Sequence, residues 1–311
     1  MTTISLTNFN FNIITFNVGT PFSLVPSEYP DCDPAFLDRL RRKNAILSLF
    51  SSWLRTSPII VLQEVPYNWK QDFDRYFTRR GYTFHCMNYG QKTNGILGVG
   101  IAVPNSYAID PTEVEFIRVA DYIDIDLSDD YSSDNEVDTN IENAKKRANL
   151  VVRIMIHLNN GKSFYLYNYH MPCAFKTPFV QMLHIYALKR IIASFPDIPY
   201  VLAGDMNILP TSKEYAFLTT NTLSTEDTQY FDTNVSITPK SSYLIVNKEE
   251  PEMTCFNYTK FGGEFCGCLD YIFVSKEFNV LKSHLLLKTK TELPNADCPS
   301  DHLPLRSVLS L

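Results

Sequence analysis

Short apolar runs in this chain repeatedly end on a polar side chain, and this arrangement constrains the fold more than any other feature. Each run has the length and composition of a buried strand. In layered folds, catalytic groups sit where rigid strands end and loops begin. The polar residues that follow such runs, or open the last one, are Asn17, Glu64, His170, Asp205, Asn207, Asp270, Asp301 and His302.

Helical and strand patterns alternate along the chain. A helix is predicted over residues 36–54, with Asp33-Pro34 before it as an N-cap and first-turn pair. The segments 150–158 and 163–170 flank Asn159-Asn160-Gly161, a sequence typical of a hairpin. A further helix is expected over 177–195 and a last strand over 303–311. Antiparallel hairpins between helices favour an α/β sandwich of mixed sheets with helices outside.

The length of 311 residues is compatible with one large domain, 1–311, and the hydrophobic content of 45% suffices for a large core. No repeat or long linker demands a second domain. The stretch from 121 to about 143 differs, because it carries nine acidic residues with little apolar periodicity. We expect it to be an exposed, mobile insertion.

The charge and the cysteines limit the partners and the compartment. The net charge is −6, so an anionic substrate must be held by a local site, and a divalent cation would help. The seven cysteines are scattered, as in reduced intracellular proteins. Neither a signal peptide nor an apolar run of about 20 residues is present. We expect a cytoplasmic, monomeric protein that does not associate with membranes.

The sequence Gly204-Asp205-Met206-Asn207 places a carboxylate and an amide two residues apart after a strand. On extended backbone both side chains project from one edge. The carboxylate can orient or deprotonate a water molecule. The amide can donate a hydrogen bond to a phosphoryl oxygen as negative charge builds there. A polar turn is the alternative interpretation.

The other polar residues fit metal and phosphate chemistry. Glu64 suits Mg²⁺, which takes one or two protein carboxylates. In Ser300-Asp301-His302 a carboxylate adjoins an imidazole. Asp270 interrupts an apolar run, and His302 is a natural partner for it because a buried unpaired carboxylate is unfavourable. The chain contains neither a phosphate-binding loop nor a Gly-x-Ser-x-Gly elbow, which excludes common nucleotide-binding and serine hydrolase motifs.

Taken in order, these motifs resemble the endonuclease/exonuclease/phosphatase superfamily, across nearly the whole chain. The resemblance implies a DNase I-like fold, a four-layer α/β sandwich of two mixed β-sheets flanked by helices. It implies that Asn17, Glu64 and Asp301 form the metal site, with Glu64 the direct Mg²⁺ ligand. It implies that Asp205 activates the nucleophile, Asn207 stabilises the transition state, and His170 and His302 contact phosphate. Asp270 then orients His302.

The C-terminal third is similar to the deadenylase branch, which includes nocturnin and the Ccr4-type, Angel and 2′-phosphodiesterase proteins. The similarity lies in residues 256–259, 265–273, 293–295 and 299–305. It implies that Phe265 stacks on a base; a core position is the alternative. Relatives usually carry a glutamine in the helix after the phosphate-binding histidine, where Gln181 and His184 are both candidates. The loop 171–176 departs from the branch, so base preference stays open.

We therefore expect a Mg²⁺-dependent phosphodiesterase, with Mn²⁺ able to substitute, that acts as a 3′-exoribonuclease on RNA ends. One alternative keeps the fold and changes the substrate to DNA with abasic or protein-linked ends, 2′-5′ or cyclic phosphates, a phosphoinositide or a sphingolipid. The other is a non-catalytic binding module. That alternative is disfavoured because every expected site residue is present.

Overall fold

The computed structural model describes residues 10–90, 96–107, 109–125, 136–232, 235, 237–289 and 291–311. The strands in the described residues are β1 (Asn10–Asn17), β2 (Ile59–Gln63), β3 (Tyr82–Tyr89), β4 (Leu97–Pro104), β5 (Val114–Arg118), β6 (Leu150–His157), β7 (Ser163–His170), β8 (Tyr200–Asp205), β9 (Lys240–Ser241), β10 (Cys255–Thr259), β11 (Gly263–Gly267), β12 (Asp270–Val274), β13 (Asn279–Leu285) and β14 (Leu305–Ser310). The α-helices are α1 (Pro34–Leu37), α2 (Arg39–Trp53), α3 (Tyr67–Thr78), α4 (Glu136–Lys145), α5 (Pro178–Ala193), α6 (Lys213–Thr220) and α7 (Ser242–Asn247).

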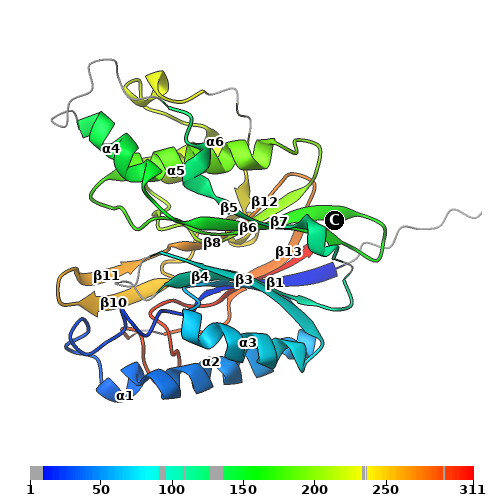
Figure 1. Ribbon diagram of the computed structural model, residues 1–311, viewed down its shortest axis with the longest axis vertical. Coiled ribbons are helices and arrows are strands. Elements are labelled where there is room, and N and C mark those ends of the chain that lie inside the picture. The colour runs from blue at the N-terminus through cyan, green and yellow to red at the C-terminus, as the bar shows by residue number, and fades with distance from the viewer. Residues whose placement is uncertain are drawn as a thin grey trace, which may run out of the picture.

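Two six-stranded sheets form the centre of the fold, in the orders β13-β14-β1-β2-β4-β3 and β5-β6-β7-β8-β12-β9. Each sheet is mixed: β1 and β2 are parallel in the first, β7 and β8 are parallel in the second, and the other pairs are antiparallel. The predicted hairpin forms β6 and β7. Helices cover the outer face of each sheet, as Figure 1 shows. The four-layer sandwich inferred from the sequence is therefore confirmed.

Apolar residues on both faces of the central strands explain their uninterrupted apolar runs. In β1, Ile13 packs in the core between the sheets, whereas Ile14 and Phe16 pack against α2 and α3. In β2, Val61 and Leu62 alternate in the same way. A strand covered on both faces gains from apolar residues at every position, because neither face meets water.

The first predicted helix is two helices in the structure. Asp33 caps α1 by accepting a hydrogen bond from the N–H of Ala35 at 2.8 Å. The chain then leaves the helical conformation at Asp38, which caps α2 by accepting from the N–H of Arg41 at 2.7 Å. The prediction of one continuous helix over 36–54 was wrong, because a second N-capping carboxylate restarts the helix.

The prediction of an exposed insertion at 121–143 was also wrong for part of the described residues. At its N-terminal end Asp121, Tyr122 and Asp124 are exposed, and Ile123 is buried. On the C-terminal side α4 packs on α5 and buries Ile141 and Ala144. Spacing of three residues places this pair on one helix face, a short apolar stripe within an acidic segment. Residues 126–135, the middle of the predicted insertion, lie outside the described residues.

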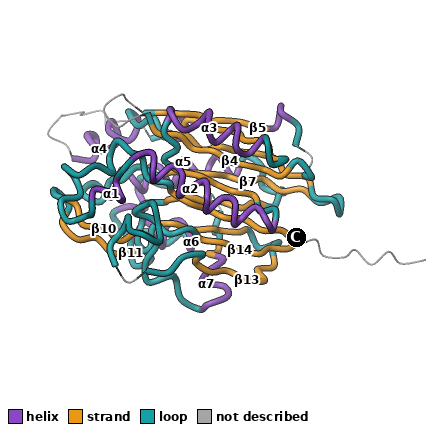
Figure 2. Tube along the Cα trace, turned by 90° about the horizontal axis from the view of Figure 1, so that it is seen from below, coloured by secondary structure: helices purple, strands orange, loops and turns teal. Residues whose placement is uncertain are grey.

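The two-stranded hairpin β10–β11 stands apart from both sheets. Figures 1 and 2 place it at the end of the molecule opposite the C-terminus, beside the loop edge of the sandwich. The strand β12 follows the hairpin directly and returns the chain to the second sheet. Within the described ranges, no helix combines the length and apolar character needed to cross a bilayer.

Candidate active site

The sheet registers bring the polar strand ends together. In the first sheet, Asn17 at the end of β1 pairs with Gln63 at the end of β2, directly before Glu64. In the second sheet, Asp205 at the end of β8 pairs with His170 on one side and with Asp270 on the other. Because the parallel pairs end at the same edge, polar groups from both sheets meet there.

Asn17 bridges the two sheets at this edge. Its Nδ2 donates to Asp205 Oδ2 at 2.9 Å and to Glu64 Oε1 at 3.3 Å. Its Oδ1 accepts from the N–H of Gly19 at 3.0 Å, which fixes the orientation of the amide. The second oxygen of Glu64, Oε2, accepts from the N–H of Thr20 at 2.8 Å. The fully buried Asn17 thus orients both carboxylates through its N–H groups.

Asp205 lies between two imidazoles. Its Oδ2 is 3.7 Å from Nε2 of His170 and 3.7 Å from Nε2 of His302. The other ring nitrogen of His170, Nδ1, is 3.0 Å from the hydroxyl of Tyr89. Nε2 of His170 also approaches Glu64 Oε1 at 4.0 Å. One carboxylate oxygen therefore faces the Nε2 edge of both rings.

Asp270 holds the second imidazole. Its Oδ2 accepts from Nδ1 of His302 at 2.7 Å and from the hydroxyl of Thr254 at 2.7 Å. Burial opposes charging of His302, but the Asp270 and Asp205 carboxylates outweigh it, and the pKa of His302 is raised well above its ordinary value. Burial raises the pKa of Asp270, although the His302 ring opposes this shift. The pairing predicted from the sequence is present.

Asn207 is held by hydrogen bonds of both its backbone and its side chain. Its N–H donates to Asp205 Oδ1 at 2.9 Å, and its Nδ2 donates to the carbonyl of Met171 at 2.9 Å. Its carbonyl accepts from Nε2 of Gln181 at 2.6 Å. Of the two candidates in α5, Gln181 therefore supports the site, whereas His184 bonds to the hydroxyl of Tyr169, away from it. An amide carries two N–H donors, so one donor of Asn207 remains for a ligand.

The backbone is tightly constrained where the strands deliver these residues. Glu64 and Asn207 have φ values of 55° and 50°, a left-handed conformation that is unfavourable for residues with a Cβ. Gly204 has a φ of 143°, and a Cβ built there would lie 2.0 Å from the carbonyl oxygen of Tyr169. Only glycine allows β8 to approach β7 so closely directly before Asp205.

Asp301 is anchored by residues of other segments. Its Oδ2 accepts from the hydroxyl of Tyr29 at 2.9 Å and from Nδ2 of Asn257 at 3.3 Å. Burial and the Asp301 carboxylate raise the pKa of Tyr29, so its hydroxyl stays protonated as a donor. No pattern in the sequence singles out Tyr29, whereas Asn257 lies in the segment that carries the family resemblance.

Arg42 of α2 supports the loops that carry the site. Its Nη2 donates to the carbonyls of Val18 and Gly19 at 2.8 and 2.7 Å, and its Nε donates to the carbonyl of Pro299 at 2.6 Å. Burial lowers the pKa of Arg42 to about 10, while Asp301 and Glu64 oppose this shift. The guanidinium therefore remains charged at neutral pH and joins the loop after β1 to the loop before β14.

A buried polar network joins the two sheets beneath the site. Nδ2 of Asn168, from β7, donates to the carbonyls of Leu62 and Gly100 in the first sheet, both at 2.9 Å. Oδ1 of Asn168 accepts from Nε2 of Gln63 at 2.9 Å. Buried amides need all of these partners, so the network fixes the relative position of the sheets.

A cavity of about 940 Å³ opens over the cluster. Of the residues predicted from the sequence, those that line it are Glu64, His170, Asp205, Asn207, Phe265, Asp301 and His302. Asn17 and Asp270 do not line it and are fully buried beneath. Phe265 packs on Phe175 with ring centroids 5.7 Å apart, so its ring forms part of the cavity wall and is not a core aromatic.

Comparison with known proteins identifies the family of the chain. The model of the endonuclease/exonuclease/phosphatase family matches residues 14–302. The mouse 2′,5′-phosphodiesterase 12 is 30% identical over 134 residues, which is 40% of this chain and 21% of that protein. This chain thus spans about a fifth of that relative's length. A probable CCR4-Not complex 3′-5′-exoribonuclease subunit Ccr4 from Vairimorpha ceranae is 24% identical over 98% of this chain and 65% of its own length.

Solved structures share the fold. ANGEL2, described as a 2′,3′-cyclic phosphatase, superposes with a TM-score of 0.73 at 17% identity, covering 98% of this chain and 96% of that chain. The human Nocturnin catalytic domain superposes with a TM-score of 0.67 at 18% identity, covering 98% and 97%. These similarities show the fold, and the family match over residues 14–302 shows the family. The chain belongs to the endonuclease/exonuclease/phosphatase family.

Proposed function

We propose that this enzyme is a Mg²⁺-dependent phosphodiesterase that removes nucleotides from the 3′ ends of single-stranded RNA, with Mn²⁺ able to substitute. One observation carries the proposal: Asp205 Oδ2 lies 3.7 Å from the Nε2 atoms of both His170 and His302, at the base of an open cavity. A base flanked by two ring nitrogens suits the hydrolysis of a phosphodiester.

In this proposal each residue has a separate role in the in-line attack by water. Asp205 accepts the proton of the attacking water, and Asn17 and the N–H of Asn207 hold its carboxylate in place. Nε2 of His302 carries a proton toward a phosphoryl oxygen, because Asp270 stabilises the charged ring. The free N–H of Asn207 and the ring of His170 donate to the other phosphoryl oxygens as charge builds.

The donor set fits a hard cation. Glu64 and Asp301 present carboxylate oxygens on the cavity wall, and oxygen is the ligand that Mg²⁺ prefers. The hydrogen bonds from Thr20 and Tyr29 hold these carboxylates without consuming all their lone pairs. Asn17 positions Glu64 through its N–H group and is a positioning residue in this proposal. When bound, the cation would supply positive charge that stabilises the developing phosphoryl charge.

Features of the cavity wall support a single-stranded nucleic acid. Phe175 and Phe265 present a pair of rings on which a base can stack, and stacking tolerates any base. Lys146 and Arg147 line the same cavity and are exposed. Two positively charged side chains therefore lie on the wall of a cavity that also contains the carboxylates of the site. The relative from Vairimorpha, which matches almost the whole chain, is named as a 3′-5′-exoribonuclease. These observations favour RNA 3′ ends over the lipid substrates.

A second candidate is the hydrolysis of 2′-5′ linkages. The segment that matches mouse 2′,5′-phosphodiesterase 12 is more similar in sequence than the match over the full chain, at 30% against 24%. Both linkages present the same phosphodiester group to the Asp205 cluster. The choice between them therefore depends on how the terminal sugar is held, not on the reacting groups.

A substrate panel tests the proposal. The purified chain is incubated with labelled poly(A), mixed-sequence RNA, 2′-5′-linked oligoadenylate and abasic duplex DNA, each with Mg²⁺ and with EDTA. We expect EDTA-sensitive release of mononucleotides from the 3′ end of RNA. An Asp205→Asn variant, in which the amide cannot act as a base, is the control for contaminating nuclease. Cleavage of DNA alone, or RNA cleavage that Asp205→Asn retains, would overturn the proposal.

A further inference from the structure

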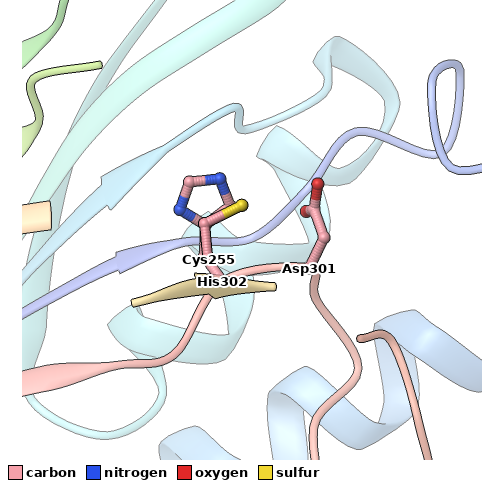
Figure 3. Close-up of side chains that lie close together, drawn as sticks. All are labelled: Cys255, Asp301 and His302. Atoms are coloured by element: carbon pink, nitrogen blue, oxygen red, sulfur yellow. The ribbon is translucent and has the colours of Figure 1, made fainter. Parts of the chain in front are cut away.

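The cavity contains a thiol that the proposed hydrolysis does not use. Cys255, the first residue of β10, is 3% exposed and lines the cavity beside Asp301 and His302. The backbone holds it there, because Cys255 forms an isolated antiparallel bridge with His302. Nδ2 of Asn257 lies 3.5 Å from its sulfur. Figure 3 shows the sulfur beside the imidazole of His302, with the carboxylate of Asp301 directed to the same space.

The three side chains form a set of metal donors. One ligand atom from each of Cys255, Asp301 and His302 lies within 4.8 Å of the other two. Tetrahedral zinc has Zn–S near 2.3 Å and Zn–N near 2.0 Å, so its sulfur and nitrogen ligands stand about 3.5 Å apart. A closure of at most about 1.3 Å would bring the set to that geometry.

The surroundings of His302 suit a zinc ligand. Its Nδ1 is bonded to Asp270 Oδ2 at 2.7 Å, which leaves Nε2 as the nitrogen available to a metal. Histidines that bind metals usually donate their other ring N–H to a carboxylate in this way. Asp301 is likewise held by Tyr29 and Asn257. Each donor therefore has a partner that fixes its direction.

We infer that Cys255, His302 and Asp301 form a site for a thiophilic divalent cation such as Zn²⁺, and that occupation of this site stops hydrolysis. Binding replaces the thiol proton and the proton on His302 Nε2, and both protons leave to solvent. The bound cation takes the nitrogen that otherwise faces the phosphoryl group. Magnesium does not compete for the thiolate, because sulfur selects softer metals. The inhibition, though not the binding, rests on the proposed function.

The inhibitory cation and the activating cation share Asp301 but differ in their other ligands. Glu64, the other proposed Mg²⁺ ligand, is not among the donors of this set. A cation that inhibits by displacing Mg²⁺ at Glu64 has no need of Cys255. The contribution of the sulfur therefore separates the proposed site from general displacement of magnesium.

Direct binding is measured by titrating the full chain with Cd²⁺ and following the ultraviolet charge-transfer band of the Cd²⁺–thiolate bond. We expect a saturable band that Cys255→Ser abolishes. Cys173→Ser is the matched control, since Cys173 lines the same cavity outside the donor set, and it should retain the band. A band that persists in Cys255→Ser, or disappears in Cys173→Ser, would refute the site. This readout is independent of whether the chain hydrolyses RNA.

Inhibition is measured as Zn²⁺ titration of the Mg²⁺-supported hydrolysis. Loss of one protein ligand should raise the inhibitory Zn²⁺ concentration by more than about tenfold in Cys255→Ser, with little change in the rate without zinc. Cys255→Ala serves the same purpose if the serine variant does not fold. Inhibition of both Cys255 variants at the wild-type zinc concentration would overturn the inhibitory role.

Discussion

The carboxylate of Asp270 lies 2.7 Å from Nδ1 of His302, and both side chains are buried at the base of the cavity. The pair unites the start of β12 with the segment before β14, residues distant in sequence. Because Asp270 does not line the cavity, we expect it to affect catalysis through His302. The ring is held with one nitrogen toward Asp270 and the other toward Asp205.

Replacement of Asp270 by asparagine should therefore impair turnover more than substrate binding. The amide cannot stabilise a charged imidazole, so we expect kcat to fall by at least about a hundredfold, the size of one lost oxyanion donor. KM should change little. Steady-state kinetics with the variant checks this, and circular dichroism checks the fold. A large change in KM with normal kcat would show that Asp270 serves binding alone.

Gly204 provides a test of the backbone at the end of β8. A Cβ in Gly204→Ala would lie 2.0 Å from the carbonyl oxygen of Tyr169, and backbone cannot move aside. We expect the free energy of unfolding to fall by at least about 3 kcal/mol. Gly161→Ala is the matched control, since Gly161 has a φ of 82° and no atom within 4 Å of the added Cβ. That variant should lose only about 1 kcal/mol, as measured by urea unfolding.

Phe265 and Phe175 should contribute to substrate binding and not to chemistry. Each alanine substitution removes a ring from the cavity wall, and stacking on one base contributes about 1–3 kcal/mol. KM for single-stranded RNA should therefore rise about fivefold or more, while kcat changes little. Phe261→Ala is the control, because Phe261 is 80% exposed at the hairpin tip and does not line the cavity. Equal effects of all three substitutions would exclude a specific stacking site.

Lys189, remote from the active site, should make the free energy of unfolding depend on pH. Its ammonium is buried against the carbonyl of Phe217 and the side chain of Asn221. Burial lowers its pKa to about 7 from the ordinary value of 10.5. Between these values the unfolded chain binds more protons than the folded chain, so the contribution of Lys189 to the free energy of unfolding rises with pH.

Comparison with Lys189→Met isolates this contribution, since methionine fills similar space without titrating. The free energy of unfolding of the wild type minus that of Lys189→Met should increase from pH 7 to pH 9.5. Urea unfolding at several pH values measures it. A difference that stays constant over this range would mean that Lys189 keeps its proton in the folded state.

The sequence predicted the strand ends well, because an apolar run that stops at a carboxylate or amide is visible locally. Asn17, Glu64, Asp205 and Asp270 were found in this way, and the structure brings them together. It also confirms the two mixed sheets. The order of strands within each sheet did not follow from local pattern, since pairing such as β1 with β14 joins opposite ends of the chain.

Arg42 is a supporting residue that the sequence did not reveal, for a physical reason. It lies on a helix, where a polar side chain in sequence gives no sign of burial. Its partners are backbone carbonyls, which leave no sequence signature. For the acidic stretch, the predicted exposure was wrong because its many charges concealed the apolar pair Ile141 and Ala144. This pair packs on α5.

Glu64 offers the most direct test of the account. Its carboxylate is fixed by Asn17 and Thr20 and faces the cavity, so Glu64→Gln should preserve the fold and remove only the charge that holds the cation. The measurement is the rate of nucleotide release from the 3′ end of RNA at saturating Mg²⁺. We predict at least about a hundredfold slower release than by the wild type, and none from the wild type in EDTA. Release at the wild-type rate by Glu64→Gln would contradict the account.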